Sequence, residues 1–265
     1  SSARVYADSK TPITEDSPRL LDVCKDDEYL KTDEYALAKA KSEDILFSSG
    51  QRNWTIIRPY ITYNANRLQL GFMEKELWLN RALNHKAIVF SKDIADKYTT
   101  LTFGGDVAKT MADLIGNKRA LGEAYNVMQE KAVKWFDVLN IYLSAFEEVF
   151  GKRPEFILTD DSDEAGKITK RSFQIKYDRL YNRVFDNTKV SVLSPGVKDS
   201  LLPKEGLNRC LKEFLTKSER VLSASWRYEG YADRVCGSKT SLSEISSLKD
   251  KTKYLLARYT QLLSR

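Results

Sequence analysis

A Tyr-x-x-x-Lys pair between two short apolar segments constrains this sequence more than any other feature. The chain opens with SSARVY at Ser1–Tyr6, carries Tyr35 and Lys39 in YALAK, and continues with WTIIRP at residues 54–59. Residues four apart share one face of a helix, so a helix here would bring the phenol and the ammonium group together. We therefore expect a helix that carries this pair, between two extended segments.

The local pattern supports that order of elements. Apolar spacing predicts a helix that begins near Asp33 and ends before Gly50. Residues 54–57 are apolar and largely β-branched or aromatic, which is typical of a buried parallel strand. The segment Val5–Tyr6 is expected to be a strand as well, and the proline-containing stretch 10–19 is expected to be a loop.

Further along the chain, apolar periodicity and turn residues predict more elements. Short strands are expected at residues 87–90 and 125–127. The polar stretch 160–170 is expected to be a loop. Helices are expected at 72–83, from Val107 after a break at Gly104–Asp106, at 135–150, at 205–215, and from Ser241, where Ser241-x-x-Glu244 has capping-box spacing.

Tyr35, Lys39 and Ser2 together suit proton transfer. A free phenol has a pKa of about 10, so its use as a base at about pH 7 needs about 4 kcal/mol of preferential stabilisation of the phenolate. An ammonium group about 4 Å away supplies about that much at an effective dielectric constant of about 20. Ser2 would hold a substrate hydroxyl or carbonyl group for proton transfer with Tyr35.

Spacing alone does not establish this role. Tyr6 and Lys10 have the same spacing, but they lie beside Pro12 in a stretch rich in turn residues. A Tyr-x-x-x-Lys pair without flanking motifs is usually an exposed pair on a helix. The segments on either side of YALAK are what favour a catalytic role for Tyr35 and Lys39.

The order of these segments resembles the extended short-chain dehydrogenase/reductase family, which includes the NAD-dependent epimerases and dehydratases of nucleotide sugars. Two weaker matches follow in the family's order, GDVA at Gly105–Ala108 and GEAYNV at Gly122–Val127. The resemblance implies an α/β fold, formed by the C-terminal part of a doubly wound Rossmann sheet, a smaller α/β substrate-binding domain and a helical tail.

The resemblance also implies a division of the chain into three segments. Residues 1–64 would be a partial Rossmann domain with the catalytic residues. Residues 65–216 would be a mixed region, in which the chain re-enters the sheet and forms the substrate-binding part. Residues 217–265 would be a basic helical C-terminal extension.

By the same resemblance, the complete protein is an NAD(P)-dependent epimerase or ketoreductase that acts on a nucleotide-linked sugar. Tyr35 would be the acid/base, assisted by Lys39 and Ser2. The cofactor, NAD or NADP, would contact Tyr35, Lys39 and Pro59. The candidate substrate-binding residues are Asn64, Lys97 and Arg183.

Departures from the family pattern limit the choice of substrate. Dehydratases of this family have Asp-Glu where this chain has Ala3-Arg4, which argues against elimination of water. Ile61 and Thr99 stand where related enzymes have an asparagine and a diphosphate-binding arginine. Another carbonyl substrate, or a binding scaffold for RNA or protein, therefore remains open. The basic residues considered in place of that arginine are Lys97, Arg179, Arg183 and Lys189.

The sequence has no Gly-x-x-Gly-x-x-Gly loop, which binds the cofactor pyrophosphate at a helix N-terminus in this family. The missing loop and the missing initiator methionine predict a fragment that is inactive alone. An incomplete sheet exposes an apolar edge and face, so we expect the isolated chain to be poorly stable or to self-associate.

Charge and composition limit the classes of partner that are expected for this protein. The net charge is +6, and residues 217–265 hold ten Lys and Arg against five Asp and Glu, spread singly along the sequence. This pattern favours a solvated helical face over a surface for nucleic acid or a membrane. No apolar run approaches the ~18–20 residues of a membrane helix, so a soluble, cytoplasmic protein is expected. The expected partner is a small-molecule substrate, and the resemblance also allows a homodimer.

The cysteines and the histidine predict no metal site. Cys24, Cys210 and Cys236 are widely spaced and His85 is the only histidine. Reduced thiols are expected, and His85 is expected at the surface.

Overall fold

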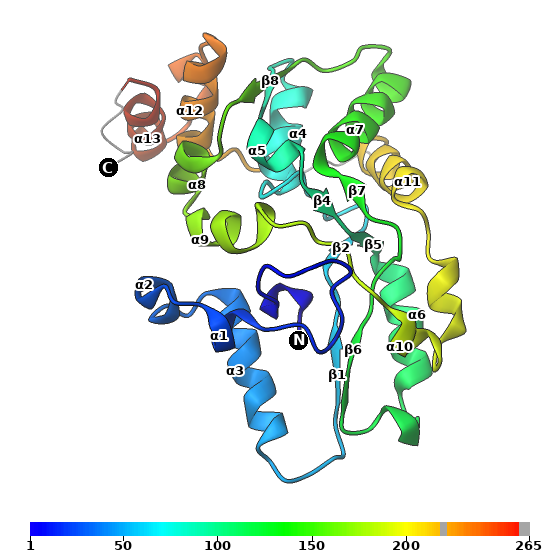
Figure 1. The fold of residues 1–265 in the computed structure, drawn as a ribbon. Helices are drawn as coiled ribbons and strands as arrows, with labels where there is room; N and C mark the ends of the chain where they lie inside the picture. The colour runs from blue at the N-terminus through cyan, green and yellow to red at the C-terminus, as the bar shows by residue number, and fades with distance from the viewer. Residues whose placement is uncertain (218–221, 260–265) are drawn as a thin grey trace. The chain divides into compact units, whose positions relative to one another are not determined.

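The structure is a computed structural model that describes residues 1–217 and 222–259 (Figure 1). The chain divides into two compact units, each assembled from three stretches of sequence. Unit 1 consists of Ser1–Asn64, Lys97–Lys134 and Tyr181–Leu207, and unit 2 consists of Ala65–Asp96, Trp135–Leu180 and Asn208–Arg265. The two units alternate along the chain, whereas the three predicted segments are continuous stretches of sequence. The division after residues 64 and 216 therefore stays a prediction.

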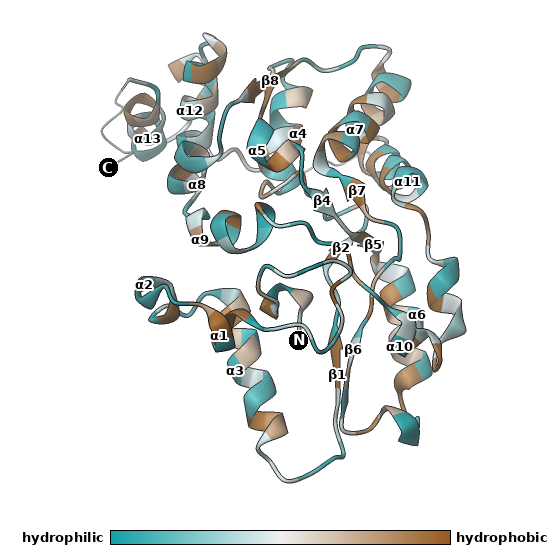
Figure 2. Cartoon of the chain, viewed as in Figure 1, coloured by the Kyte–Doolittle hydropathy of each residue, from teal (hydrophilic) through white to brown (hydrophobic). Residues whose placement is uncertain are grey.

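The strands of unit 1 pair mainly in parallel, as expected of an α/β fold. β1 (Thr55–Arg58) pairs in parallel with β6 (Glu123–Asn126), and β2 (Ile61–Tyr63) pairs in parallel with β5 (Leu101–Phe103). β4 (Tyr98–Thr99) and β7 (Val133–Lys134) form an antiparallel pair. Figure 2 shows hydrophobic residues along β1, and the strand alternates between half-buried and buried residues.

The helices of unit 1 are short except for α3 and α6. The core of the unit includes Val107 and Leu114 of α6, Tyr125 of β6, and Val190 and Val197, which belong to one buried cluster. Burial of each such side chain contributes about 1.5–3 kcal/mol, so this cluster fixes α6 beside β6. The helical elements are η1 (Ala3–Val5), α1 (Leu20–Val23), α2 (Asp27–Leu30), α3 (Tyr35–Phe47), α6 (Gly104–Leu114), η2 (Lys118–Ala120), α10 (Thr188–Ser191) and η4 (Pro195–Asp199).

Unit 2 is mainly helical around the parallel pair of β3 (Ile88–Ser91) and β8 (Phe156–Thr159). Trp78 stacks on Tyr142 with ring centroids 4.5 Å apart, which joins α4 to α7. The helical elements are α4 (Lys75–Leu83), α5 (Lys92–Ala95), α7 (Trp135–Phe150), α8 (Asp163–Thr169), α9 (Ser172–Gln174), the π-helical turn η3 (Ile175–Arg179), α12 (Trp226–Cys236), η5 (Leu242–Glu244) and α13 (Leu248–Tyr259). Helix α11 (Pro203–Leu215) runs from unit 1 into unit 2.

A buried arginine ties α12 to α4. Arg81 Nη1 lies 2.7 Å from a carboxylate oxygen of Glu229 and 3.0 Å from one of Asp233. Asp233 also accepts hydrogen bonds from the Thr240 and Tyr254 hydroxyls at 2.6 and 2.9 Å. A buried charge that loses its partner costs about 3–5 kcal/mol, so this cluster fixes α12 and α13 within unit 2.

Most of the predicted elements are confirmed. The helix predicted before Gly50 is α3, the strand predicted at 54–57 is β1, and the strand predicted at 125–127 is β6. Helices α4, α6, α7 and α11 and strand β3 are also found where they were predicted, with ends shifted by a few residues. Gly151 has a φ of 70° and follows the last residue of α7, as its predicted role in ending that helix requires.

Two predictions near the N-terminus and in the middle of the chain are wrong. The opening segment is the 3-10 turn η1 and not a strand, because the Ser2 side chain accepts the Arg4 N–H and caps the turn. Residues 160–170 contain helix α8 and not only a loop. Ala165 and Ile168 are buried three residues apart, so a single apolar face stabilises a helix that is otherwise polar.

Two further predictions are partly wrong. The capping box at Ser241 and Glu244 is present, but it caps the 3-10 turn η5, and α13 begins only at Leu248. Gly104 and Gly105 lie in the first turn of α6 instead of forming a break before it.

The structure also bears on the predictions for the cysteines, the histidine and membrane-spanning helices. Cys24, Cys210 and Cys236 are free thiols, and His85 is exposed, as predicted. Within residues 1–217 and 222–259, none of the helices has the length and apolar composition required to cross a bilayer.

We expect Gly230→Ala to lower the free energy of unfolding by about 1–2 kcal/mol. A Cβ at this residue of α12 would overlap the Tyr254 backbone oxygen and stand 3.1 Å from the Ala257 Cβ. This overlap outweighs the gain of about 1 kcal/mol in helix propensity. Denaturant unfolding followed by circular dichroism measures the change.

Gly196→Ala is the matched control, because a Cβ there meets no atom within 4 Å. It should change the free energy of unfolding by less than about 0.5 kcal/mol. Equal effects of the two substitutions would contradict the close crossing of α12 and α13.

Candidate active site

Ser2 lies at the carboxyl end of β1. The Ala3 N–H donates to the Pro59 carbonyl oxygen at 2.9 Å, and the Ser2 hydroxyl donates to the same oxygen at 3.4 Å. Ser2 Oγ also accepts the Arg4 N–H at 3.3 Å. The Ser2 side chain is buried, so backbone groups hold its hydroxyl in this structure.

Tyr35 is the first residue of α3, and Glu34 caps that helix. The Glu34 carboxylate accepts the Ala36 N–H at 2.7 Å and the Tyr29 hydroxyl at 3.1 Å. The same carboxylate forms an ion pair with Arg4. A negative charge at this position is stabilised by the free N–H groups and the dipole of the helix. Glu34 therefore fixes the start of α3 and the backbone position of Tyr35.

The Tyr35 ring lies close to two cations. Lys39 Nζ is 5.5 Å and the Arg4 guanidinium carbon is 5.3 Å from the ring centroid. Tyr35 is 46% exposed, so part of its ring is accessible to a ligand. The structure thus brings Tyr35 and Lys39 side by side, and Arg4 connects them to Ser2 through its backbone N–H. The catalytic role of these residues stays a prediction.

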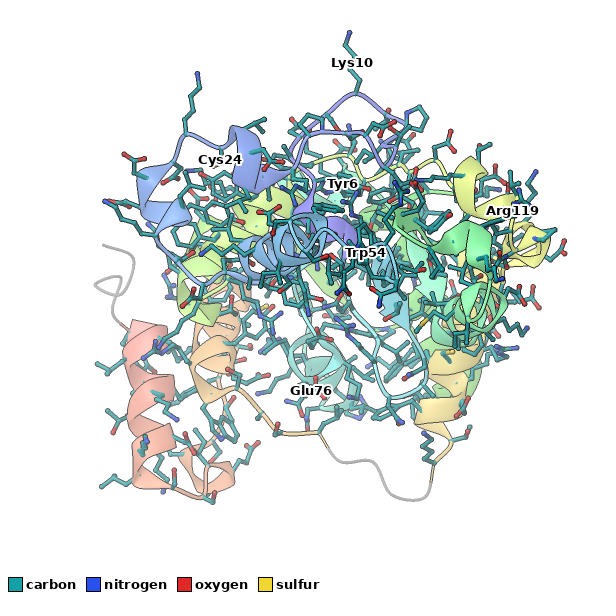
Figure 3. All side chains as sticks on the ribbon, turned by 90° about the horizontal axis from the view of Figure 1, so that it is seen from below. Tyr6, Lys10, Cys24, Trp54, Glu76 and Arg119 are labelled. Atoms are coloured by element: carbon teal, nitrogen blue, oxygen red, sulfur yellow. The ribbon has the colours of Figure 1, made fainter. Side chains whose placement is uncertain are left out.

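The second Tyr-x-x-x-Lys spacing has a different geometry. Tyr6 is fully buried, and its hydroxyl donates to Asn126 Oδ1 at 2.8 Å. Lys10 is exposed and points away from the ribbon in Figure 3. Burial raises the pKa of Tyr6 far above its usual range. Tyr6 is therefore unsuited to proton transfer near neutral pH.

An ion pair between Arg58 and Glu43 joins β1 to α3. Arg58 is the last residue of β1, and Glu43 lies one turn after Lys39 on α3. The Arg58 Nε and Nη2 atoms donate to the two carboxylate oxygens of Glu43, each at 2.8 Å. Both side chains are almost completely buried. Two parallel hydrogen bonds fix the angle as well as the distance, so the pair holds α3 at the carboxyl end of β1.

Neighbouring groups keep Glu43 ionised. Burial by itself would raise the pKa of the Glu43 carboxyl, but the hydrogen bonds and charge of Arg58 outweigh it and hold the pKa below its ordinary value of 4.5. Arg19 adds a second cation, with Nη1 3.4 Å from Glu43. Arg58 also donates to the Tyr6 hydroxyl at 2.8 Å, which extends the network to Asn126 of β6.

The predicted substrate-binding residues occupy three different environments. Asn64 is exposed directly after β2, and Lys97 is half-buried directly before β4. Arg183 is buried, and its guanidinium donates to the carbonyl oxygens of Tyr6 and Ala7 at 3.0 and 3.2 Å. Burial lowers the pKa of Arg183. A role in substrate binding stays a prediction for all three, and Asn64 is the most accessible.

The two positions that depart from the family pattern face the interior. Ile61 of β2 and Thr99 of β4 are both buried. Neither side chain is accessible to a substrate in this structure. A substrate would therefore have to be held by other residues than those at the two family positions.

The residues of the site fit one end of a dinucleotide. The phenol of Tyr35 and the ammonium group of Lys39 are hydrogen-bonding groups of the kind that contact ribose hydroxyls, and the Tyr35 ring is partly exposed. The sequence has no glycine-rich loop to receive the pyrophosphate. Among the residues that the structure describes, His, Cys, Asp and Glu side chains form no group of three or more that could hold a metal ion.

Sequence reasoning missed the supporting roles of Glu34, Glu43 and Arg4. Glutamate is not among the favoured N-cap residues, so the sequence carried little sign of the cap at Glu34. Glu43 had a clearer signal, because it falls on the same helical face as Ala36 and Ala40, which are buried. An acidic residue on an apolar helix face requires a buried cationic partner.

We expect Glu43→Gln to lower the free energy of unfolding by about 3–5 kcal/mol at about pH 7, because it leaves Arg58 buried without its carboxylate. Urea unfolding measures the change. Glu147→Gln is the matched control, since its pair with Arg153 is exposed, and it should cost less than about 1 kcal/mol.

The effect of Glu43→Gln should shrink in acid. The pKa of Glu43 is lowered in the folded protein, so its carboxylate stabilises the fold above its ordinary pKa of 4.5 and loses this effect as the pH falls through the folded-state pKa. Unfolding free energies of the unmodified protein and of Glu43→Gln should therefore converge on acidification. A difference that stays constant with pH would contradict the ionised pair.

No protein-family model matches this sequence, and no curated protein matches it. Solved structures do match. UDP-glucuronic acid 4-epimerase from Bacillus cereus, in complex with UDP-glucuronic acid and NAD, has a TM-score of 0.57 and 16% identity, over 80% of this chain and 60% of that chain. UDP-glucose 4-epimerase from Bifidobacterium longum, in complex with NAD⁺ and UDP, has a TM-score of 0.54 and 18% identity, over 80% and 61%.

A protein of another kind has a similar fold. The terminal R domain from the myxalamid PKS-NRPS biosynthetic pathway has a TM-score of 0.52 and 16% identity, over 81% of this chain and 56% of that chain. This chain therefore spans about 60% of the length of the epimerase structures it matches. At such low identity the likeness concerns the fold. This chain shares the α/β fold of these UDP-sugar 4-epimerases.

Proposed function

We propose that this chain carries the catalytic residues of an NAD-dependent epimerase or ketoreductase that acts on a nucleotide-linked sugar. The observation that carries the proposal is the pairing of Tyr35 with Lys39 on α3, in the same unit as Ser2 at the end of β1. Arg4 contacts both the Ser2 hydroxyl and the Tyr35 ring. A hydroxyl, a phenol and an ammonium group of one unit suit proton transfer with a sugar hydroxyl.

Each residue has a separate part in the proposed reaction. Tyr35 accepts the proton of the sugar hydroxyl when that carbon is oxidised, and returns it when the ketone is reduced. Lys39 assists Tyr35 with its ammonium group, which lies beside the Tyr35 ring. Ser2 exchanges its hydrogen bond to the Pro59 oxygen for one to the substrate oxygen. When bound, NAD supplies the hydride chemistry, and whether the hydride returns to the same molecule separates an epimerase from a ketoreductase.

The solved neighbours support NAD and a UDP-sugar as the ligands to test first. The Bacillus cereus epimerase was solved with both, and the Bifidobacterium longum enzyme was solved with NAD⁺ and UDP. Because this chain spans about 60% of those structures, the activity is proposed for the complete protein.

A second candidate keeps the redox chemistry but changes the substrate to another carbonyl compound. The buried Ile61 and Thr99 favour it, because they stand where related enzymes have an asparagine and a diphosphate-binding arginine, and neither side chain is accessible here. The likeness to an R domain from a PKS-NRPS pathway supports the same candidate at the level of the fold.

We expect Tyr35→Phe to lower kcat about 100 to 10,000-fold, because the phenol oxygen transfers the proton. It should weaken NAD⁺ binding by no more than about tenfold, the effect of one lost hydrogen bond to the cofactor. The protein expressed from its complete gene is assayed with UDP-glucuronic acid and UDP-glucose by NMR, and NAD⁺ binding is measured by calorimetry. Tyr98→Phe is the matched control, since Tyr98 is 43% exposed on β4, and it should keep full activity.

The outcomes separate the candidates. Full activity of Tyr35→Phe would remove Tyr35 as the acid/base. Cofactor-dependent reduction of a ketone without any change in either UDP-sugar would favour the second candidate. Failure of the complete protein to bind NAD⁺ or NADPH would reject the redox function and would favour a binding scaffold.

A further inference from the structure

Helix α13 has an inner face that is fixed to unit 2. Tyr254 and Ala257 are buried, and Gly230 of α12 lies against this part of α13. The Tyr254 hydroxyl accepts the Thr240 N–H at 2.9 Å and donates to Asp233 at 2.9 Å. These contacts set the rotation of the helix about its axis, so they also decide which residues face outward.

The outer face of α13 carries an apolar stripe. Leu248, Leu255, Leu256 and Tyr259 are between 37% and 81% exposed. Figure 2 shows both hydrophobic and hydrophilic residues along this helix. Four large apolar side chains on the solvent side of one 12-residue helix are not explained by packing within unit 2.

The stripe has the spacing of a coiled-coil seam. Leu248, Thr252, Leu255 and Tyr259 are separated by four, three and four residues, which assigns Leu248 and Leu255 to d positions and Thr252 and Tyr259 to a positions. The buried residues Tyr254 and Ala257 then fall at c and f, on the opposite side.

The positions beside the seam carry positive charge. The e and g positions hold Lys249, Lys251 and Arg258, with Leu256 at the remaining e position. The acidic residue of this helix, Asp250, falls at an f position. Its carboxylate accepts hydrogen bonds from Lys253 Nζ and from the Ser247 hydroxyl. In a coiled coil the e and g residues of one helix face those of the partner, so like charges there oppose self-pairing.

We propose that the outer face of α13 is a docking site for a helix of a partner protein with apolar a and d positions and acidic e and g positions. Charge complementarity carries this choice of partner. A second copy of this chain would place Lys and Arg opposite Lys and Arg. A stripe only one to two residues wide, with threonine at an a position, suits the groove of a helix better than the broad apolar face of a membrane-surface helix.

Synthetic peptides of three heptads test the proposal. One peptide has Leu at a and d and Glu at e and g, and the control peptide has Lys at e and g. Binding of each labelled peptide to the protein is followed by fluorescence anisotropy. The acidic peptide should bind at least about tenfold more tightly than the basic one, and its affinity should fall as the salt concentration rises.

Substitutions on α13 distinguish docking from a structural role. Leu255→Glu should weaken binding of the acidic peptide at least about tenfold. Ile45→Glu on α3 is the matched control, because Ile45 is 70% exposed, and it should leave binding unchanged. The double substitution Lys249→Glu and Lys251→Glu should reverse the preference toward the basic peptide, a result that a change in stability would not produce. Circular dichroism verifies that each variant is folded.

Four results would overturn the proposal. Equal binding of the two peptides, or no binding of either, would exclude charge complementarity as the basis for choosing the partner. Self-association that Leu255→Glu abolishes, measured by sedimentation, would identify a second copy as the occupant. Binding to phosphatidylserine vesicles without binding to the acidic peptide would identify an anionic lipid surface.

Discussion

The arrangement of the candidate site depends on the buried ion pair between Arg58 and Glu43. Two charges that are withdrawn from water lose most of their hydration. The bidentate contact offsets that loss, together with the hydrogen bond that Arg58 donates to the Tyr6 hydroxyl and the one that Arg19 donates to Glu43. Apolar residues of similar volume would join β1 to α3 without this cost. We infer that the pair contributes more to the position of α3 relative to β1 than to stability. It places Glu43 at a fixed point beside the end of β1, and Lys39 lies one helical turn earlier.

Unit 2 also contains a buried arginine that is paired with carboxylates. Arg81 is buried between Glu229 and Asp233, and the two carboxyls respond differently to burial. For Glu229 burial dominates and raises the pKa. For Asp233 burial acts in the same direction, but hydrogen bonds from Thr240 and neighbouring positive charges outweigh it and lower the pKa to about 2. Asp233 therefore stays ionised and anchors α12, and through Tyr254 it sets which face of α13 is left to solvent.

The candidate site pairs Tyr35 with Lys39 at the spacing of the family motif, but the residues around this pair differ from the family pattern. Tyr35 and Lys39 lie together on α3 in a fold shared with NAD-dependent epimerases of UDP-sugars. The buried Ile61 and Thr99 differ from the family's substrate positions, and Arg4 places an additional cation near the Tyr35 ring. In the proposed reaction, Tyr35 and Lys39 serve proton transfer and the surrounding residues serve substrate choice, so the proposed type of reaction has more support than any one substrate.

Local periodicity in the sequence was sufficient to predict α3, β1 and the placing of Tyr35 one helical turn before Lys39, because these depend on residues close in the chain. It failed for η1 and α8, where a serine cap and a single buried face outweighed local composition. Only the tertiary structure decided which charges are buried in pairs. Arg58 meets Glu43 across 15 residues and Arg81 meets Asp233 across 152, and the cost of burying a charge is offset only when both partners have folded into place.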